Sequence, residues 1–90
     1  MPKNDWVYVG HMLDMSQKAL DLASDINKAT YDRDETLKLA LTHLLQVIGM
    51  RRRIVHDYLN VDEDVIWEVI QKDLPELARM LRNIIPSEYL

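Results

Sequence analysis

The chain has 90 residues, 48% of them hydrophobic, and a formal net charge of −4 at neutral pH. This length fits one small domain that buries only about 60 to 65% of its unfolded surface, so a second copy would stabilise it. The negative charge excludes a nucleic-acid binder that relies on overall positive charge, and any polyanion must meet a local basic patch. The lack of cysteine excludes disulfides and thiolate zinc sites and fits a reducing compartment.

The start of the chain, Met1-Pro2-Lys3-Asn4-Asp5, carries no apolar signal core, and no run approaches the roughly 18 apolar residues of a membrane helix. We therefore expect a cytoplasmic protein without a membrane partner. Few glycines and prolines, together with the lack of strand-like alternation, predict an all-α fold.

Two amphipathic helices are predicted in the first half. Asn4 and Asp5 can cap a helix over about 6–30, in which the residues of the inner face recur every three or four positions. That face is formed by Val9, Leu13, Ser16, Leu20, Ala23 and Ile26. Asp32 and Glu35 form a capping-box pattern that predicts a second helix over 34–48. Its stripe is Leu37, Leu41, Leu44 and Ile48, widened by Ala40, Leu45 and Val47.

A third helix is expected over about 50–59. The apolar period continues past Gly49, but Arg51 and Arg52 occupy its next positions before Val55 and Leu59 resume it. Because burying an unpaired guanidinium is costly, either the chain turns at Gly49 or this part of the stripe faces an open cleft.

A fourth helix is expected over 63–85, because Asn60 and Glu63 form another capping-box pattern. Pro75 lies inside it and lacks the N–H that a helix interior needs, which predicts a kink or a one-turn break. Its inner stripe is Ile66, Ile70, Leu74, Leu77, Leu81 and Ile84. Together the four elements predict an antiparallel helical bundle.

The candidate chemistry is concentrated in Arg51-Arg52-Arg53-Ile54-Val55-His56-Asp57-Tyr58. Guanidinium groups bind phosphate oxygens through a planar fork, and histidine exchanges protons near neutral pH. The structural alternative is a solvated face whose arginines pair with acidic groups of neighbouring helices. Residues four apart share a helical face, so spacing alone favours Arg52 over Arg51 as the partner of His56.

No other cluster predicts a cofactor or a metal. His11 and His43 stand apart without ligand spacing. Asp32, Asp34 and Glu35 lack the calcium-loop pattern, and helix capping explains them better. The sequence contains neither a zinc motif nor a glycine-rich phosphate loop.

The stretch from Gly49 to Leu77 resembles the core of the HepT-like proteins of the HEPN (higher eukaryotes and prokaryotes nucleotide-binding) superfamily. Their signature is Arg, four residues, His, one residue and Tyr, followed by a Trp-containing helix and an Asp-Leu-Pro turn. In this sequence the signature falls on Arg51, His56 and Tyr58, then on Trp67 and on Asp73-Leu74-Pro75.

The resemblance implies one HEPN-like domain over 1–90 and a dimer, or a higher homo-oligomer, with two motifs in a shared cleft. It implies a toxin-type, metal-independent endoribonuclease acting on RNA. Arg51 would stabilise charge on the phosphate and His56 would act as general acid or base, with Arg52 and Arg53 binding substrate. A composite site across a two-fold axis reconciles this role of Arg51 with the helical spacing that favours Arg52.

The resemblance also implies a partner, a minimal nucleotidyltransferase antitoxin that transfers AMP to Tyr58. The added nucleotide would place negative charge and bulk in the cleft. The alternative is a non-catalytic interaction or nucleotide-binding subunit that partners the nucleotidyltransferase.

The sequence departs from the family in two ways. Arg52 stands where the family commonly has Asn, and a segment with an acidic residue is missing after Gly49. Fusion of the second and third helices into a rod of roughly 37 Å, from about Glu35 to Leu59, would favour domain swapping. The other explanation for the missing segment is a disordered loop that is absent from this sequence.

Overall fold

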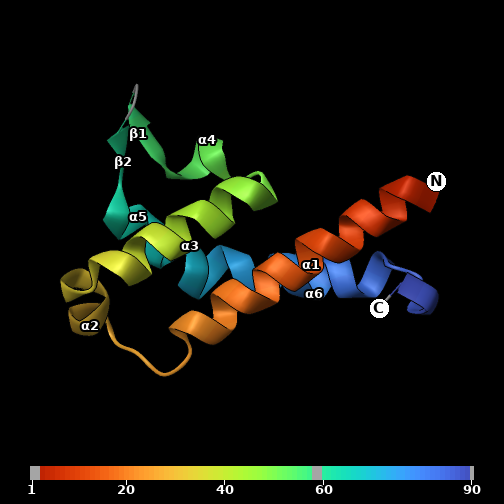
Figure 1. Cartoon of the computed structure of the whole chain (residues 1–90), viewed down its shortest axis with the longest axis horizontal. Helices are drawn as coiled ribbons and strands as arrows, with labels where there is room; N and C mark the ends of the chain where they lie inside the picture. The colour runs from red at the N-terminus through yellow and green to blue at the C-terminus, as the bar shows by residue number, and fades with distance from the viewer. Residues whose placement is uncertain (1–2, 58–59, 90) are drawn as a thin grey trace.

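The computed structural model describes residues 3–57 and 60–89, with the side chains of residues 3, 52, 55–57 and 60 outside the description. Helices dominate, so the expected helical class is confirmed. In chain order the elements are α1 (Lys3–Ala23), α2 (Lys28–Arg33), α3 (Glu35–Ile48), α4 (Arg51–Ile54), strands β1 (Val55–Asp57) and β2 (Asn60–Val61), α5 (Glu63–Glu68), the π-helical turn η1 (Val69–Asp73), α6 (Leu74–Ile84) and the 3-10 turn η2 (Ser87–Tyr89) (Figure 1).

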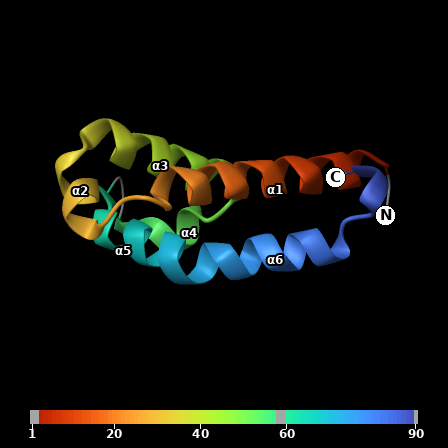
Figure 2. The same ribbon diagram turned by 90° about the horizontal axis from the view of Figure 1, so that it is seen from below.

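Helix α1 packs against both α3 and α6, and Figure 2 shows α1 and α6 side by side along the long axis. The buried apolar residues form two clusters. One joins α1 to α2, α3, α4, α5, η1 and the start of α6, and contains Ala19, Ala23, Tyr31, Leu41, Leu45, Ile48, Ile54, Ile66, Val69, Ile70 and Leu74. The other joins α1 to α6, and contains Leu13, Ala78, Leu81 and Ile85. Among the described helices, none is long and apolar enough to cross a bilayer.

The first helix is shorter than the predicted range of 6–30. It ends at Ala23, where the Ser24 N–H donates to the carbonyl of Asp21 at 3.3 Å. Asn27 then caps α2, because its side chain accepts from the Thr30 N–H at 2.9 Å. The apolar period predicted one long helix because Ile26, which packs against the core from the connecting loop, happens to continue it.

Helix α3 closely matches the prediction of 34–48, but its cap is Asp34 and not Asp32. The Asp34 carboxylate accepts from the Leu37 N–H at 3.0 Å. The helix ends at Gly49, whose φ of 99° lies in the left-handed region that only glycine adopts at little cost. The chain therefore turns at Gly49. The fused rod from Glu35 to Leu59 is wrong, and the domain swap built on it loses its basis.

The predicted helix over 50–59 is wrong beyond Ile54, where the chain enters a two-stranded antiparallel ribbon. Val55 lies opposite Val61 and Asp57 opposite Asn60, with an irregularity in register between the pairs. Ile54 is completely buried, and its carbonyl accepts from the Asp62 N–H at 3.0 Å. A reversal is needed because the chain must return from Ile54 to α5, and a continued helix would carry it away from that position.

The last helix passes through the π-helical turn η1 in place of the expected break at Pro75. The Leu74 N–H donates to the carbonyl of Val69, five residues earlier. Pro75 follows in the first turn of α6, where its missing N–H is tolerated.

The π turn also changes which residues of α6 are buried at two positions of the predicted stripe, because it adds a residue to one turn of the helix. The predicted stripe would bury Ile84, but this side chain is 57% exposed and Ile85 is buried at 6%. Ala78 likewise takes the fully buried position expected for Leu77, which is only half-buried. The predicted stripe is therefore right at Leu74 and Leu81, which are buried, and off by one residue at Leu77 and Ile84.

Candidate functional site

The arginine-rich segment begins on α4 and continues into the ribbon of β1 and β2, which projects from the helices (Figure 1). Arg51, at the start of α4, is exposed to solvent. Ile54, at its end, is fully buried in the larger core cluster. The segment is thus fixed to the core by an apolar side chain, while the guanidinium of Arg51 stays accessible to a ligand in solution.

The helical-face argument for Arg52 is wrong, because the backbone of His56 lies in β1 rather than on a helix shared with Arg52. The side chains of Arg52 and His56 lie outside the description. Tyr58 lies outside the described residues. Their convergence with Arg51 on one ligand therefore stays a prediction from the family signature.

Arg53 pairs with an acidic residue of the neighbouring helix, as the structural alternative expected. Its Nε–H donates to Oδ2 of Asp73 at 3.2 Å, and the two side chains are 54% and 39% exposed. An exposed ion pair of this kind contributes only about 0 to 1 kcal/mol. Its main consequence is geometric, because it links α4 to the last residue of the π turn.

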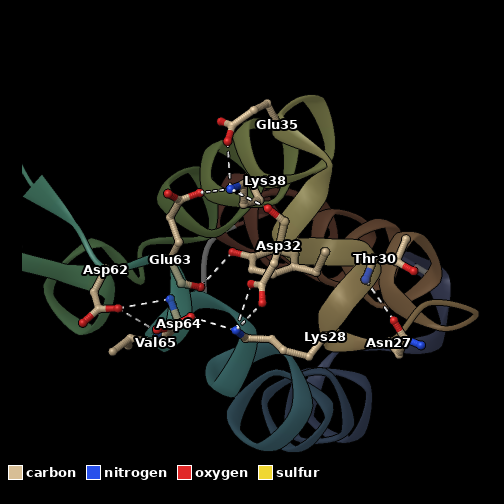
Figure 3. A network of polar contacts seen from close by, with 11 residues as sticks. Asn27, Lys28, Thr30, Asp32, Glu35, Lys38, Asp62, Glu63, Asp64 and Val65 are labelled. Carbon is tan, nitrogen blue, oxygen red and sulfur yellow. Dashed lines mark hydrogen bonds and ion pairs between the residues drawn. The ribbon is translucent and has the colours of Figure 1, made fainter.

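The other end of the ribbon leads directly into a capped helix. Asp62 Oδ1 accepts from the backbone N–H groups of Asp64 at 3.1 Å and Val65 at 3.2 Å (Figure 3). The cap of α5 is therefore Asp62, and the expectation that Asn60 forms it is wrong. An aspartate here satisfies otherwise free N–H groups and opposes the positive end of the helix dipole.

Two lysines connect the start of α5 to α2 and α3, and we call the connected residues the lysine network (Lys28, Asp32, Glu35, Lys38, Glu63 and Asp64). Lys28 Nζ lies 2.8 Å from Asp32 Oδ1 and 2.8 Å from Asp64 Oδ1. Lys38 Nζ lies 2.8 Å from Glu35 Oε1 and 3.3 Å from Glu63 Oε2. Figure 3 shows Lys38 between these two carboxylates. Together with Val61 and Asp62, most of these residues line an open pocket beside the ribbon.

The electrostatics of the lysine network favour a structural role. Hydrogen bonds to Asp32 and then to Asp64 raise the pKa of Lys28, and the hydrogen bond to Glu35 is the main cause of the raised pKa of Lys38. The hydrogen bond from Lys28 lowers the pKa of Asp64. All three groups are therefore charged at neutral pH, and none of them is tuned to exchange protons there.

Tyr31 supports the same junction from inside the core. The side chain is completely buried, and its hydroxyl donates to the carbonyl of Glu63 at 2.8 Å. Its ring centroid lies 5.0 Å from that of Trp67. Burial raises the pKa of Tyr31, so its hydroxyl remains a protonated donor. Glu63 is thus held through its carbonyl by Tyr31 and through its carboxylate by Lys38.

Sequence reasoning missed this junction. The spacing of Lys28 to Asp32, four residues, and of Glu35 to Lys38, three residues, is a helical ion-pair signal that the sequence does carry. The pairing with Glu63 and Asp64 has no such signal, because these residues lie far along the chain.

Within the described residues, no group of three or more histidine or acidic side chains is arranged to hold a metal ion.

The fold and the site define a small helical protein in which a basic, histidine-containing segment leaves the helices as a ribbon and returns to a capped helix. A family model described as Ribonuclease HepT-like matches residues 43–84, which include Arg51, His56 and Tyr58. Over this segment the chain is similar to the HepT-like family, and the resemblance drawn from the sequence is confirmed.

Three curated relatives match part of the chain. A "putative RNase" of Caldanaerobacter subterraneus subsp. tengcongensis is 37% identical over 43 residues, covering 48% of this chain and 38% of that protein. Two "putative RNases" of Methanocaldococcus jannaschii are each 32% identical over 40 residues, covering 44% of this chain and 34% and 33% of those proteins. The match thus spans little more than a third of the length of these relatives. No solved structure matches the chain at a significant level.

Proposed function

We propose that this chain is a toxin-type, metal-independent endoribonuclease. The observation that carries the proposal is that the match to the HepT-like ribonucleases covers the whole segment from Arg51 to Tyr58. The accessible guanidinium of Arg51 supports it, because a phosphate of a large substrate must be reached from solvent. RNA would meet a local basic segment on a chain whose net charge is −4.

The proposed reaction uses the 2′-hydroxyl of the RNA as nucleophile. This oxygen attacks the adjacent phosphorus, the bond from phosphorus to the 5′-oxygen breaks, and the products are a cyclic phosphate and a free 5′-hydroxyl. His56 takes the proton of the nucleophile or gives one to the leaving oxygen, and Arg51 stabilises the negative charge that develops on the phosphate. Arg52 and Arg53 help to bind the RNA backbone, with Arg53 oriented by Asp73.

The active form on this proposal is a homodimer or a higher homo-oligomer, in which motifs from two copies meet in one cleft. Its regulator is a minimal nucleotidyltransferase that transfers AMP to Tyr58. The transferred group adds negative charge and bulk across the cleft, which would repel the phosphates of an RNA substrate.

The test is RNA cleavage by purified protein in EDTA, comparing wild type with His56→Ala. We expect the variant to lose at least about a hundredfold in rate, the usual contribution of a general acid or base. His43→Ala is the matched control, because it removes the same side chain from an exposed position on α3. Cleavage that survives His56→Ala at the wild-type rate would contradict the assigned role.

A wild-type protein that cleaves no RNA would favour the second candidate, a non-catalytic subunit that binds the nucleotidyltransferase or a nucleotide. The observation that supports this candidate is that Arg52 replaces the Asn common in the family. Incubation with ATP and the nucleotidyltransferase, followed by mass spectrometry of the intact protein, tests the modification. The mass should increase by one AMP unit in wild type and stay unchanged in Tyr58→Phe.

A further inference from the structure

The segment that carries Arg51 and His56 is fixed to the helices at both of its ends. Directly before the ribbon, the side chain of Ile54 is completely buried in the core. At its end, the Asp62 N–H closes the ribbon onto the carbonyl of Ile54 at 3.0 Å, and Glu63 and Asp64 follow at once. Where the ribbon returns to the helices is therefore decided by what holds Glu63 and Asp64.

Lys38 is the most enclosed charged group of the lysine network. Its side chain is 11% exposed, whereas the carboxylates of Glu35 and Glu63 that it pairs with are 78% and 50% exposed. A lysine ammonium has three N–H donors. Here Nζ has three oxygen acceptors, at 2.8 Å on Glu35, 3.3 Å on Glu63 and 3.1 Å on the backbone carbonyl of Asp32.

These three acceptors belong to three different parts of the chain. The carbonyl of Asp32 lies in α2, Glu35 begins α3, and Glu63 begins α5. The ammonium of Lys38 thus lies where the three helices meet, as Figure 3 shows. Lys28 reinforces the contact from α2 to Asp64, but its side chain is 40% exposed, and Asp32 and Asp64, with which it pairs, lie in α2 and α5.

We infer that Lys38 is a positioning residue, which sets the return point of the ribbon and thereby the placement of the segment from Arg51 to His56. This inference rests on the proposed ribonuclease function. Lys38 bonds to groups of α2, α3 and α5, so its effect would pass through Glu63 and the backbone of the ribbon. Displacement of reacting groups by about 1 Å costs up to about a hundredfold in rate without removing any contact to substrate.

The test compares Lys38→Met with wild type in steady-state RNA cleavage. Methionine keeps the apolar stem and removes the ammonium. We expect kcat to fall by about tenfold with KM within about twofold, because substrate binding is retained and only the placement of the catalytic groups changes. Lys72→Met is the matched control, since Lys72 also forms an ion pair, with Glu68 at 3.1 Å, but one confined to α5 and η1.

Hydrogen exchange of the ribbon amides supplies a readout that does not need activity. The Asp62 amide should exchange several-fold faster in Lys38→Met and at the wild-type rate in Lys72→Met. Glu63→Gln should also speed exchange of the Asp62 amide. The double variant Lys38→Met/Glu63→Gln should exchange no faster than Lys38→Met alone, because both substitutions break the same contact between Lys38 and Glu63.

The outcomes separate the two proposals. Faster exchange in Lys38→Met supports the positioning role even if wild type cleaves no RNA, and in that case it is the ribonuclease function that fails. Exchange and kcat in Lys38→Met equal to those of Lys72→Met would overturn the positioning role. A fall in kcat that only follows a loss of folded protein, measured by circular dichroism at the assay temperature, would also overturn it.

Discussion

At the scale of single residues, the junction beside the ribbon depends on polar groups whose partners are far apart in sequence. Tyr31 is buried completely, and a buried hydroxyl without a partner would be costly. Its donation to the carbonyl of Glu63 at 2.8 Å satisfies both groups at once. The residue therefore stabilises α2 against the start of α5 by hydrogen bonding as well as by apolar contact.

Replacing Tyr31 with Phe should lower the free energy of unfolding by about 1 to 2 kcal/mol, because the change keeps the ring and leaves the Glu63 carbonyl without its donor. Urea denaturation followed by circular dichroism measures this. Tyr8→Phe is the control, since Tyr8 is 58% exposed and should change stability by less than about 0.5 kcal/mol. Equal stability of Tyr31→Phe and wild type would contradict the assigned hydrogen bond.

At the scale of secondary-structure elements, the position of the arginine-rich segment depends on where α3 stops. Gly49 ends the helix in the left-handed region, and the Met50 N–H donates to the carbonyl of Leu45 at 2.9 Å. This turn directs α4 back toward α5 and gives Ile54 its place in the core. A residue for which a positive φ is unfavourable would disturb both the direction of α4 and the burial of Ile54.

Gly49→Ala should lower the free energy of unfolding by about 1 kcal/mol, because a residue with a Cβ atom is strained at a φ of 99°. A Cβ atom built at Gly49 meets nothing within 4 Å, so the loss would report backbone strain alone. Thermal unfolding of Gly49→Ala and Gly49→Asn measures it. The asparagine variant should lose less, since asparagine tolerates this region better, and a larger loss for asparagine would count against backbone strain as the cause.

At the scale of the whole molecule, the chain is extended for its length. Its radius of gyration is 13.7 Å with extents of 40 × 31 × 20 Å, whereas a compact domain of this length has about 12 Å. The ion pairs of the lysine network lie toward one end of this extended shape and connect α2 and α3 with α5. The free energy of unfolding of the whole chain should therefore vary with pH as those ion pairs gain or lose charge.

Lys28→Met should lower the thermal unfolding midpoint at neutral pH, although only modestly because the pairs are solvent-exposed. The pKa of Asp64 lies below its usual 3.8 in the folded protein, so its contribution is present above that value and is lost as the pH falls through the lower, folded pKa. The pKa of Lys28 lies above its usual 10.5, so its contribution is constant until the pH rises beyond that value.

The difference in midpoint between wild type and Lys28→Met should therefore be flat between about pH 5 and 9 and shrink below about pH 4. Circular dichroism melts across this range measure it. Lys18→Met is the control, because it removes an equivalent charge from the exposed side of α1. A difference that grew on acidification would contradict the Lys28 to Asp64 pair.

The sequence by itself determined the helical class, the extent of α3, the resemblance to the HepT-like family and the concentration of phosphate-binding residues between Arg51 and Tyr58. These follow from local terms, namely the helical period, capping patterns and a signature of neighbouring residues. Only the tertiary structure decided between a turn at Gly49 and a continued helix, and showed that a ribbon replaces the helix after Ile54 and that Ile85 rather than Ile84 is buried. It also paired Lys38 with Glu63. The ribbon and the pairing of Lys38 with Glu63 depend on contacts between residues far apart in the chain, whose free energies outweigh local helical propensity and leave no periodic trace in the sequence.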